Sequence, residues 1–278
     1  MRPAVRRAAV LGSPVAHSLS PVLHRAAYSE LGLHRWVYEA HDVDVAALPE
    51  FFADLDGTWA GLSLTMPLKA AVLPLLDGAS PLAEAVGAAN TVLLRDGQRL
   101  GDNTDVPGIE AALRDAGVTN VPSAAVLGGG ATARSAVAAL GRVTSSITAY
   151  VRSPERAEGL SATAAACGVD LAVRPWARAA QALAMPLVLN TTPGGAADEL
   201  AGRTPDRPGL LFEVLYDPWP TPLVRAWRAR GGAVVDGLAL LVHQAVLQVA
   251  LMTEVEVDPA RLAPVLRAAG ERALRARG

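Results

Sequence analysis

Short apolar runs alternate with segments of helical periodicity along the whole chain. The first part of this pattern predicts strands over 8–11, 36–41, 59–64, 89–94 and 98–102, and helices over 20–31, over 45–54, from Pro67, near 80–87 and from Asp105. The second part predicts strands over 124–127, 147–151, 171–173, 186–190, 210–216 and 233–237, and helices after 128–130, after Pro154, and over 222–230, 238–254 and 259–275. Such alternation is typical of βα units around mainly parallel sheets.

The length of the chain, 278 residues, suits two domains of roughly 100–150 residues each. We predict an α/β fold in which residues 1–105 form an N-terminal domain with a mixed, mainly parallel sheet, completed by the C-terminal helices within 238–278. Residues 106–237 form a second α/β domain. Residues 120–123, Asn-Val-Pro-Ser, have the composition of a boundary loop.

Charges are nearly balanced, with 25 Lys and Arg residues against 27 Asp and Glu residues. A net charge of -2 provides no general field to attract nucleic acid or an anionic membrane, so we predict neither as a partner. The apolar segment from Gly237 contains His243, Gln244 and Gln248 and is shorter than a typical membrane span, which predicts a buried helix.

Cys167 is the only cysteine, which excludes an intrachain disulfide and a cluster of thiolates around a metal. The five histidines show no close paired spacing on a predicted helix, so we predict no metal site. The apolar run Ala8–Leu11 after the first arginines is too short for a secretory leader and is better explained as a strand. This cysteine usage suits a protein of the reducing cytoplasm.

A glycine-rich turn lies between the strand over 124–127 and the following helix. It has the pattern G-x-G-x-x-A and consists of Gly128, Gly129, Gly130, Ala131, Thr132 and Ala133. Glycines permit a tight turn and let backbone N–H groups approach a pyrophosphate at a helix N-terminus, where the dipole favours negative charge. The pattern predicts a Rossmann-type dinucleotide-binding domain; the alternative is an ordinary tight βα turn.

The next strand is followed by Arg152 and Ser153, with Arg156 one helical turn further. An NAD site usually has an acidic residue there, which accepts hydrogen bonds from the ribose 2′-hydroxyl. Because a guanidinium suits a 2′-phosphate, the sequence favours NADP over NAD. The missing acid also disfavours an S-adenosylmethionine methyltransferase. The alternative is that both arginines are solvated surface charges.

Two further segments lie where open α/β sheets bind ligands, at the carboxyl ends of strands. Asn190, Thr191 and Thr192 follow one strand, and Asp236 with Gly237 follows the last strand. Either segment is also compatible with an ordinary turn.

Small polar residues follow the strands of the first domain as well. Ser18 and Ser20 come after the first strand, although Ser20 before Pro21 is also typical of a helix N-cap. Alternation along the third strand places Ser63 and Thr65 on the same side.

Lys69 falls in the first turn of the helix predicted from Pro67. The positive end of the helix dipole disfavours a charged lysine there, which suits a general acid or base, whereas most lysines are solvated surface groups. Asn90 offers both a donor and an acceptor. Asp105 precedes a helical pattern and is either an N-cap or the partner of Lys69 in proton transfer.

Taken together, these residues resemble the shikimate dehydrogenase family over nearly the whole chain. The matching segments are S-x-S-P at 18–21, S-L-T-M-P-L-K at 63–69, G-A-A-N-T at 87–91, G-D-N-T-D at 101–105, E-V-L-Y-D-P and T-P-L within 213–223, and D-G-L to Q-A at 236–245. The departures from the family pattern are Ser63 where Asn is usual, Val106 where Gly is common, Val151 for Asn and Leu241 for Met. None of them removes a candidate acid, base or phosphate anchor.

The resemblance implies NADPH-dependent reduction of 3-dehydroshikimate to shikimate, on the route to chorismate and the aromatic amino acids. It implies an active-site cleft between the two domains, with Lys69 and Asp105 as the catalytic pair. The implied substrate contacts are Ser18, Ser20, Ser63, Thr65, Lys69, Asn90, Asp105, Tyr216 and Gln244. The implied cofactor contacts are the six residues of the glycine turn, Arg152, Ser153, Arg156, Asn190, Thr191, Thr192, Leu215 and Gly237.

Two alternatives to this function stay open. One is a dehydrogenase of the same family that also uses quinate or prefers NAD, which Ser18, Ser20 and Arg152 disfavour. The other is a non-catalytic sensor that binds shikimate and NADP, which the presence of Lys69 and Asp105 disfavours. The sequence is compatible with both a monomer and a homodimer.

Overall fold

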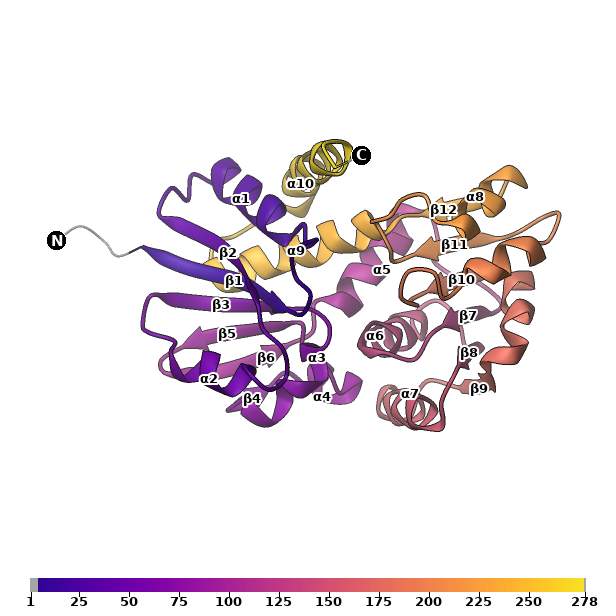
Figure 1. The fold of residues 1–278 in the computed structure, drawn as a ribbon, viewed down its shortest axis with the longest axis horizontal. Coiled ribbons are helices and arrows are strands. Elements are labelled where there is room, and N and C mark those ends of the chain that lie inside the picture. The colour runs from indigo at the N-terminus through magenta and orange to yellow at the C-terminus, as the bar shows by residue number, and fades with distance from the viewer. Residues whose placement is uncertain (1–4, 278) are drawn as a thin grey trace. The chain divides into compact units, whose positions relative to one another are not determined.

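The structure, a computed structural model, describes residues 5–277 and divides into two compact units. Unit 1 holds the described residues up to Thr104 together with those from Leu241 onward, and unit 2 spans Asp105–Leu240. Helix α9 (Gly237–Thr253) begins in unit 2 and continues in unit 1. Each unit has its own six-stranded sheet (Figure 1). The predicted α/β fold, with one mixed sheet and one Rossmann-type sheet, is confirmed.

In unit 1 the strands lie in the order β2-β1-β3-β5-β6-β4. Their bounds are β1 Arg6–Gly12, β2 Trp36–Asp42, β3 Trp59–Leu64, β4 Gly78–Ala79, β5 Thr91–Arg95 and β6 Gln98–Asp102. Strand β1 is parallel to β2 and β3, and β4 is parallel to β6, whereas β5 is antiparallel to both β3 and β6. The sheet is therefore mixed.

The register of this sheet brings three loops together at one end of its central strands. Strands β1 and β3 end level with each other, with Leu11 opposite Leu64, and the antiparallel β5 begins opposite Ser63. Gly12 permits the close approach of the first two loops, because a Cβ there would collide with the side chain of Thr65. The loops after β1 and β3 and the loop before β5 therefore leave the sheet together.

Helices flank the sheet of unit 1, and two of them, α1 and α10, pack against each other (Figure 1). The bounds are α1 Ser20–Glu30, α2 Leu48–Ala53, α3 Leu68–Ala71, α4 Pro81–Val86 and α10 Pro259–Arg275, with a 3-10 turn, η1, at Leu73–Leu75. The helix predicted over 45–54 begins only at Leu48, because Asp44 Oδ1 accepts a hydrogen bond from the Ala47 N–H and forms a turn there. Strand β4 was not predicted, since Gly78 and Ala79 form no apolar run.

In unit 2 all six strands are parallel, in the order β12-β11-β10-β7-β8-β9. The strands are β7 Ala124–Leu127, β8 Ile147–Val151, β9 Leu171–Pro175, β10 Leu187–Asn190, β11 Leu210–Glu213 and β12 Ala233–Val235. The α-helices are α5 Asp105–Asp115, α6 Ala131–Leu140, α7 Pro154–Cys167 and α8 Pro222–Ala229, and the 3-10 helices are η2 Trp176–Ala184 and η3 Asp198–Arg203.

Two details of unit 2 differ from the sequence predictions. The strand predicted over 210–216 ends at Glu213, because its neighbour β10 ends at the paired residue Asn190. The helices η2 and η3 were not predicted, since a 3-10 helix repeats every three residues and does not give the 3.6-residue period of an α-helix.

The strand order of unit 2 reverses next to β7, whose neighbours are β8 on one side and β10 on the other. In open α/β sheets, ligands bind outside the carboxyl ends of the strands at such a switch point. The segments that follow β7, β8 and β10 are therefore the ones to examine for a cofactor. Residues 120–123 lie inside unit 2, between α5 and β7. Within residues 5–277, α9 included, no helix combines the length and apolar character that a membrane span requires.

Candidate active site

The loop after β1 carries Ser18 and leads into α1 at Ser20. Leu19 is the N-cap residue of α1 and Ser20 is the first residue inside the helix, so the N-cap alternative for Ser20 is wrong. Ser20 is buried, its side chain hydrogen bonds to the Tyr38 hydroxyl, and its backbone N–H donates to Ser18 Oγ over 3.3 Å. The hydrogen bonds of both serines thus hold them at the carboxyl end of β1.

Ser63 is buried near the carboxyl end of β3, and its hydroxyl belongs to a chain of hydrogen bonds. Tyr38 Oη donates to Ser63 Oγ over 2.6 Å, and Ser63 Oγ donates to Gln248 Oε1 over 2.7 Å. Burial raises the pKa of Tyr38 far above its ordinary value, so this hydroxyl keeps its proton. Thr65 is half-buried and lies one residue beyond the end of β3, where its N–H donates to the Leu11 carbonyl over 2.9 Å.

Lys69 lies in the short helix α3, which begins one residue later than predicted, and is half-buried. Its carbonyl oxygen accepts a hydrogen bond of 2.7 Å from the N–H of Ala89. Ala89 immediately precedes Asn90, so the backbone of Lys69 is joined to the loop before β5. The structure thus brings the lysine and the asparagine motifs of the sequence together in unit 1.

Asn90 is buried just before β5, and its side chain hydrogen bonds to several neighbouring residues. Its Oδ1 accepts the N–H of Thr104 over 2.8 Å and the hydroxyl of Thr91 over 3.0 Å. Its Nδ2 lies 2.9 Å from Thr104 Oγ1 and 3.4 Å from Gln244 Oε1. Asn90 and Gln244 are 154 residues apart in the chain, and the fold makes their side chains neighbours.

Asp105 is buried and is the first residue of α5, so it lies inside the helix rather than at an N-cap position before it. It directly follows Thr104, the partner of Asn90, but it belongs to unit 2, whereas Lys69 belongs to unit 1. The pairing of Lys69 with Asp105 stays a prediction.

Three residues of this network, Tyr38, His24 and Gln248, were not predicted as part of the site. His24 is fully buried and stacks on Tyr38, with ring centroids 3.9 Å apart. Burial lowers the pKa of His24 to about 3, although a hydrogen bond to Gln248 opposes this, so the imidazole is neutral. The sequence did contain one signal: Gln244 and Gln248 are one helical turn apart in a mostly apolar helix, which places two carboxamides on one face.

The glycine turn of unit 2 lacks room for side chains at its first two positions. Gly128 has a φ of +110°, and a Cβ there would lie 2.6 Å from Thr191 Oγ1. A Cβ on Gly129 would lie 2.8 Å from Cβ of Arg156 and 3.0 Å from Cγ1 of Val151. Thr191 after β10 and Arg156 on α7 therefore border the turn on its two sides.

Helix α6 begins directly after this turn. Its N-cap residue is Gly130, which has no side chain to accept from the first-turn N–H groups. Ala131 and Thr132 are half-buried, whereas Ala133 is fully buried against the sheet, as the close packing of the G-x-G-x-x-A pattern requires. These residues fit a dinucleotide, because uncapped N–H groups at the positive end of a ten-residue helix suit a pyrophosphate.

Arg152 and Arg156 are exposed, Arg156 borders the glycine turn, and Ser153 between them is the N-cap residue of α7. The structure adds a third arginine that the sequence analysis missed, Arg134 on α6. Burial and the nearby charge of Arg156 lower the pKa of Arg134. A bound anion would offset the repulsion between these positively charged arginines, so they fit a phosphate-bearing nucleotide.

The segment Asn190–Thr192 is fixed by a buried carboxyl group, that of Glu213. Asn190 Nδ2 donates to Glu213 Oε2 over 2.8 Å, and Asn190 Oδ1 accepts from Thr192 Oγ1 over 2.7 Å. The backbone N–H of Leu215 and the hydroxyl of Thr221 also donate to Glu213, over 3.2 and 3.3 Å. Glu213 thereby ties the loop after β10 to the loop after β11.

Gly237 opens α9 in contact with the loop after β11. A Cβ on this residue would collide with the carbonyl oxygen of Val214 and lie 2.9 Å from that of Leu215. Only glycine therefore permits this approach. Tyr216 follows in the same loop and is half-buried.

We expect Glu213 to make the stability of the protein fall between about pH 4.5 and pH 7. Burial raises the pKa of this carboxyl from 4.5 to about 7, although three donated hydrogen bonds oppose the shift. The folded protein binds this proton more tightly than the unfolded chain does. The stabilisation is therefore complete below pH 4.5 and is lost as the pH rises through 7, by about 3 kcal/mol.

Urea unfolding of the wild type and of Glu213→Gln across this pH range measures the effect. Because glutamine stays neutral, the difference in unfolding free energy between the two proteins is expected to change by about 3 kcal/mol across the window. Parallel curves would show that Glu213 does not titrate there. The contribution of His24 to the pH dependence of the unfolding free energy is the same in both proteins, so it cancels in their difference.

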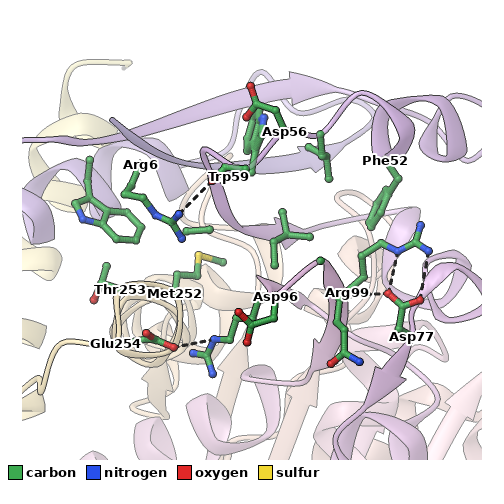
Figure 2. Close-up of a pocket in the computed structure, with 18 residues that line it drawn as sticks. Arg6, Phe52, Asp56, Trp59, Asp77, Asp96, Arg99, Met252, Thr253 and Glu254 are labelled. Atoms are coloured by element: carbon green, nitrogen blue, oxygen red, sulfur yellow. Dashed lines mark hydrogen bonds and ion pairs between the residues drawn. The ribbon is translucent and has the colours of Figure 1, made fainter. Parts of the chain in front are cut away.

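A cavity of about 750 Å³ lies at the other end of the unit 1 sheet, next to the first residues of β1 and β3 (Figure 2). None of the predicted substrate residues lines it. Two of the arginines that line it form ion pairs, with Arg95 Nε 3.0 Å from Glu254 and Arg99 Nε 3.2 Å from Asp77. We therefore do not assign the substrate to this cavity. In the part of the chain that the structure describes, no group of three His, Cys, Asp or Glu side chains is arranged to hold a metal.

The parallel sheet of unit 2, with a glycine turn and basic residues at its switch point, gives the chain the fold of a dinucleotide-binding α/β protein. It is 36% identical over 267 residues to a shikimate dehydrogenase (NADP(+)) of Thermus thermophilus, a match that covers 95% of this chain and 98% of that protein. The chain belongs to the shikimate dehydrogenase family.

Further comparisons agree with this assignment. Residues 10–92 match the family described as the shikimate dehydrogenase substrate binding domain. The crystal structure of Mycobacterium tuberculosis shikimate dehydrogenase is 37% identical, with a TM-score of 0.86 over 95% of this chain and 99% of that one. The Thermus thermophilus enzyme in complex with NADP(H) and shikimate is 35% identical, with a TM-score of 0.80 over 95% and 99% of the two chains.

Proposed function

We propose that this chain catalyses the NADPH-dependent reduction of 3-dehydroshikimate to shikimate and the reverse oxidation, a step toward chorismate. Relatives that match it over nearly their whole length are named for this activity and for NADP(+). Within the molecule, the observation that carries the proposal is the hydrogen bond from Ala89 to the carbonyl of Lys69. It holds the backbone of the lysine beside Asn90 and the buried polar network.

Most of the groups proposed for substrate recognition are hydroxyls and carboxamides of unit 1, and Asp105 and Tyr216 of unit 2 complete the set. The hydroxyls of Ser18 and Ser20 would donate to the substrate carboxylate, because a carboxylate only accepts hydrogen bonds. The ring hydroxyls would be bound by Ser63, Thr65, Asn90, Asp105, Gln244 and Tyr216. Hydroxyls both donate and accept, which suits the mixed donors and acceptors of this set.

Lys69 is the proposed acid and base. In reduction its ammonium group would give a proton to the substrate oxygen, and in oxidation its amine would take the hydroxyl proton. Asp105 is its proposed partner, which would hold the reacting hydroxyl in place. NADPH, when bound, supplies the hydride.

The cofactor contacts are proposed for unit 2. The backbone N–H groups of the turn from Gly128 to Ala133 would bind the pyrophosphate. Arg152, Ser153 and Arg156 would bind the 2′-phosphate. The remaining contacts would come from Asn190, Thr191 and Thr192 along the cofactor and from Leu215 and Gly237 near the nicotinamide.

The test is to mix the purified protein with shikimate and NADP and to follow absorbance at the NADPH band. Rates with shikimate or quinate, each with NADP or NAD, then separate the alternatives. We expect the highest kcat/KM with shikimate and NADP. Turnover of quinate or NAD at an equal kcat/KM would favour the broader dehydrogenase, and binding of both ligands without turnover would favour a sensor.

We also propose that the enzyme works in the cytoplasm, because its single cysteine suits a reducing compartment. It acts as a monomer or a homodimer, which sedimentation of the purified protein distinguishes.

A further inference from the structure

We propose that Gln248 is a positioning residue of the substrate pocket, whose carboxamide makes Ser63 a pure hydrogen-bond acceptor toward a bound ring hydroxyl and fixes the backbone at Asn90. This inference rests on the proposed function of the pocket. Gln248 lies on α9, one helical turn beyond Gln244, and is only 1% exposed.

Every hydrogen-bonding position of the Gln248 carboxamide is used. Its Nε2 donates to the Asn90 carbonyl over 3.1 Å and to Thr91 Oγ1 over 2.9 Å. Its Oε1 accepts from Ser63 Oγ over 2.7 Å and lies 3.3 Å from Nε2 of His24. A primary carboxamide has two donors and two acceptor positions, so none is left over.

The partners leave one orientation for this carboxamide. The Asn90 carbonyl can only accept, so it must face the nitrogen of Gln248 and not the oxygen. The oxygen therefore faces Ser63 and His24. His24, neutral through burial, meets it with a protonated Nε2.

The fixed carboxamide decides what Ser63 offers to a ligand. An amide oxygen accepts only, so the single proton of Ser63 must point to Gln248. One lone pair of Ser63 accepts from Tyr38 over 2.6 Å, and the second is its remaining hydrogen-bonding position. A ring hydroxyl that meets Ser63 has to donate to it.

Helix α9 also contacts Asn90 at two points, with the Gln248 side chain at its carbonyl and Gln244 Oε1 3.4 Å from its Nδ2. Loss of the Gln248 carboxamide would leave Ser63 free to rotate and release the backbone of Asn90. Both changes act on the substrate side of the reaction, whereas the residues proposed for the cofactor belong to unit 2.

Gln248→Met tests this, because methionine keeps the length of the side chain and removes all four hydrogen bonds. We expect KM for shikimate to rise about 10-fold, as expected for loss of well-aligned buried hydrogen bonds, with kcat within about 3-fold and KM for NADP unchanged. The matched control is Val249→Ala, which changes the next residue of α9, fully buried, outside the network. It is expected to lower the melting temperature as well, with no change in KM for shikimate.

A second variant guards against failure of the first to fold. Gln248→Glu keeps an acceptor for Ser63 and, when ionised, has no donor for Asn90, so its KM for shikimate is expected to lie between those of the wild type and Gln248→Met. Combination with Ser63→Ala completes the test: if Gln248 acts through Ser63, the two changes together raise KM by clearly less than the product of their separate effects.

The inference would be overturned, and the proposed function left intact, if the wild type is active and Gln248→Met, Gln248→Glu and Val249→Ala all keep its KM for shikimate. Independent, multiplicative effects of Ser63→Ala and Gln248→Met would overturn the coupling through Ser63. A wild type that does not oxidise shikimate would overturn the proposed function and this inference together.

Discussion

Replacement of Lys69 by alanine is expected to lower kcat for shikimate oxidation by about 10²-fold or more, with little change in KM for shikimate. Without the amine, no group takes the hydroxyl proton as the carbon gives up its hydride. The serine, asparagine and glutamine side chains that bind the substrate stay in place. Steady-state rates at saturating NADP, followed through NADPH absorbance, measure both constants.

Lys69→Arg is the informative companion of this variant. Arginine keeps the positive charge, but its guanidinium does not give up a proton in proteins. We therefore expect it to be nearly as slow as Lys69→Ala, whereas a purely electrostatic role would leave it close to the wild type. Near-normal turnover in the alanine variant would refute the assignment.

The composition makes a chemical test of the same residue possible. Of the 25 Lys and Arg residues in the chain, Lys69 is the only lysine. A reagent that acylates amines therefore modifies this one side chain besides the N-terminus. Loss of activity that bound shikimate slows down, in step with acylation of the Lys69 side chain followed by peptide mass spectrometry, would assign the loss to this amine.

The features that could be predicted from sequence depend on neighbours in the chain. The glycine turn was predictable because a strand, three glycines and a helix follow one another, and the structure shows why side chains are excluded at Gly128 and Gly129. The mixed sheet of unit 1 was predictable from its apolar runs, because the strands predicted over 89–94 and 98–102 are separated by too few residues for a parallel connection, and β5 and β6 are antiparallel. Both predictions needed only local pattern and turn chemistry.

What escaped prediction depends on contacts between distant parts of the chain. Gln248 meets Ser63 across 185 residues, and a buried glutamine in an apolar helix gives no local sign of its partner. Tyr38 and His24 belong to no motif of the sequence, and only the folded chain joins them to Ser63 and Gln248 through hydrogen bonds and to each other through stacking. Ser20 was ambiguous, since a serine before proline caps many helices.

Replacement of Arg152 by alanine is expected to raise KM for NADP by about 10-fold or more and to leave KM for NAD nearly unchanged. A charge-assisted hydrogen bond to a phosphate contributes roughly 1.5–3 kcal/mol. NAD has no 2′-phosphate and does not make this bond, so its binding loses nothing in the variant. Arg156 and Arg134 remain in the variant, so the residual preference for NADP is expected to be reduced rather than abolished. Initial rates with both cofactors at saturating shikimate measure the change.

Arg225→Ala is the matched control for this prediction. Arg225 is also exposed, but it lies on α8, which follows β11 on the other half of the sheet, and its guanidinium donates to the Pro220 carbonyl. Since it removes the same net charge without touching the switch point, it should change KM for NADP little. Added salt should also raise KM for NADP more steeply in the wild type than in Arg152→Ala, because screening acts on the interaction that the variant has lost. Equal increases in KM for NADP and NAD would show that Arg152 supports the fold of the turn and does not recognise the 2′-phosphate.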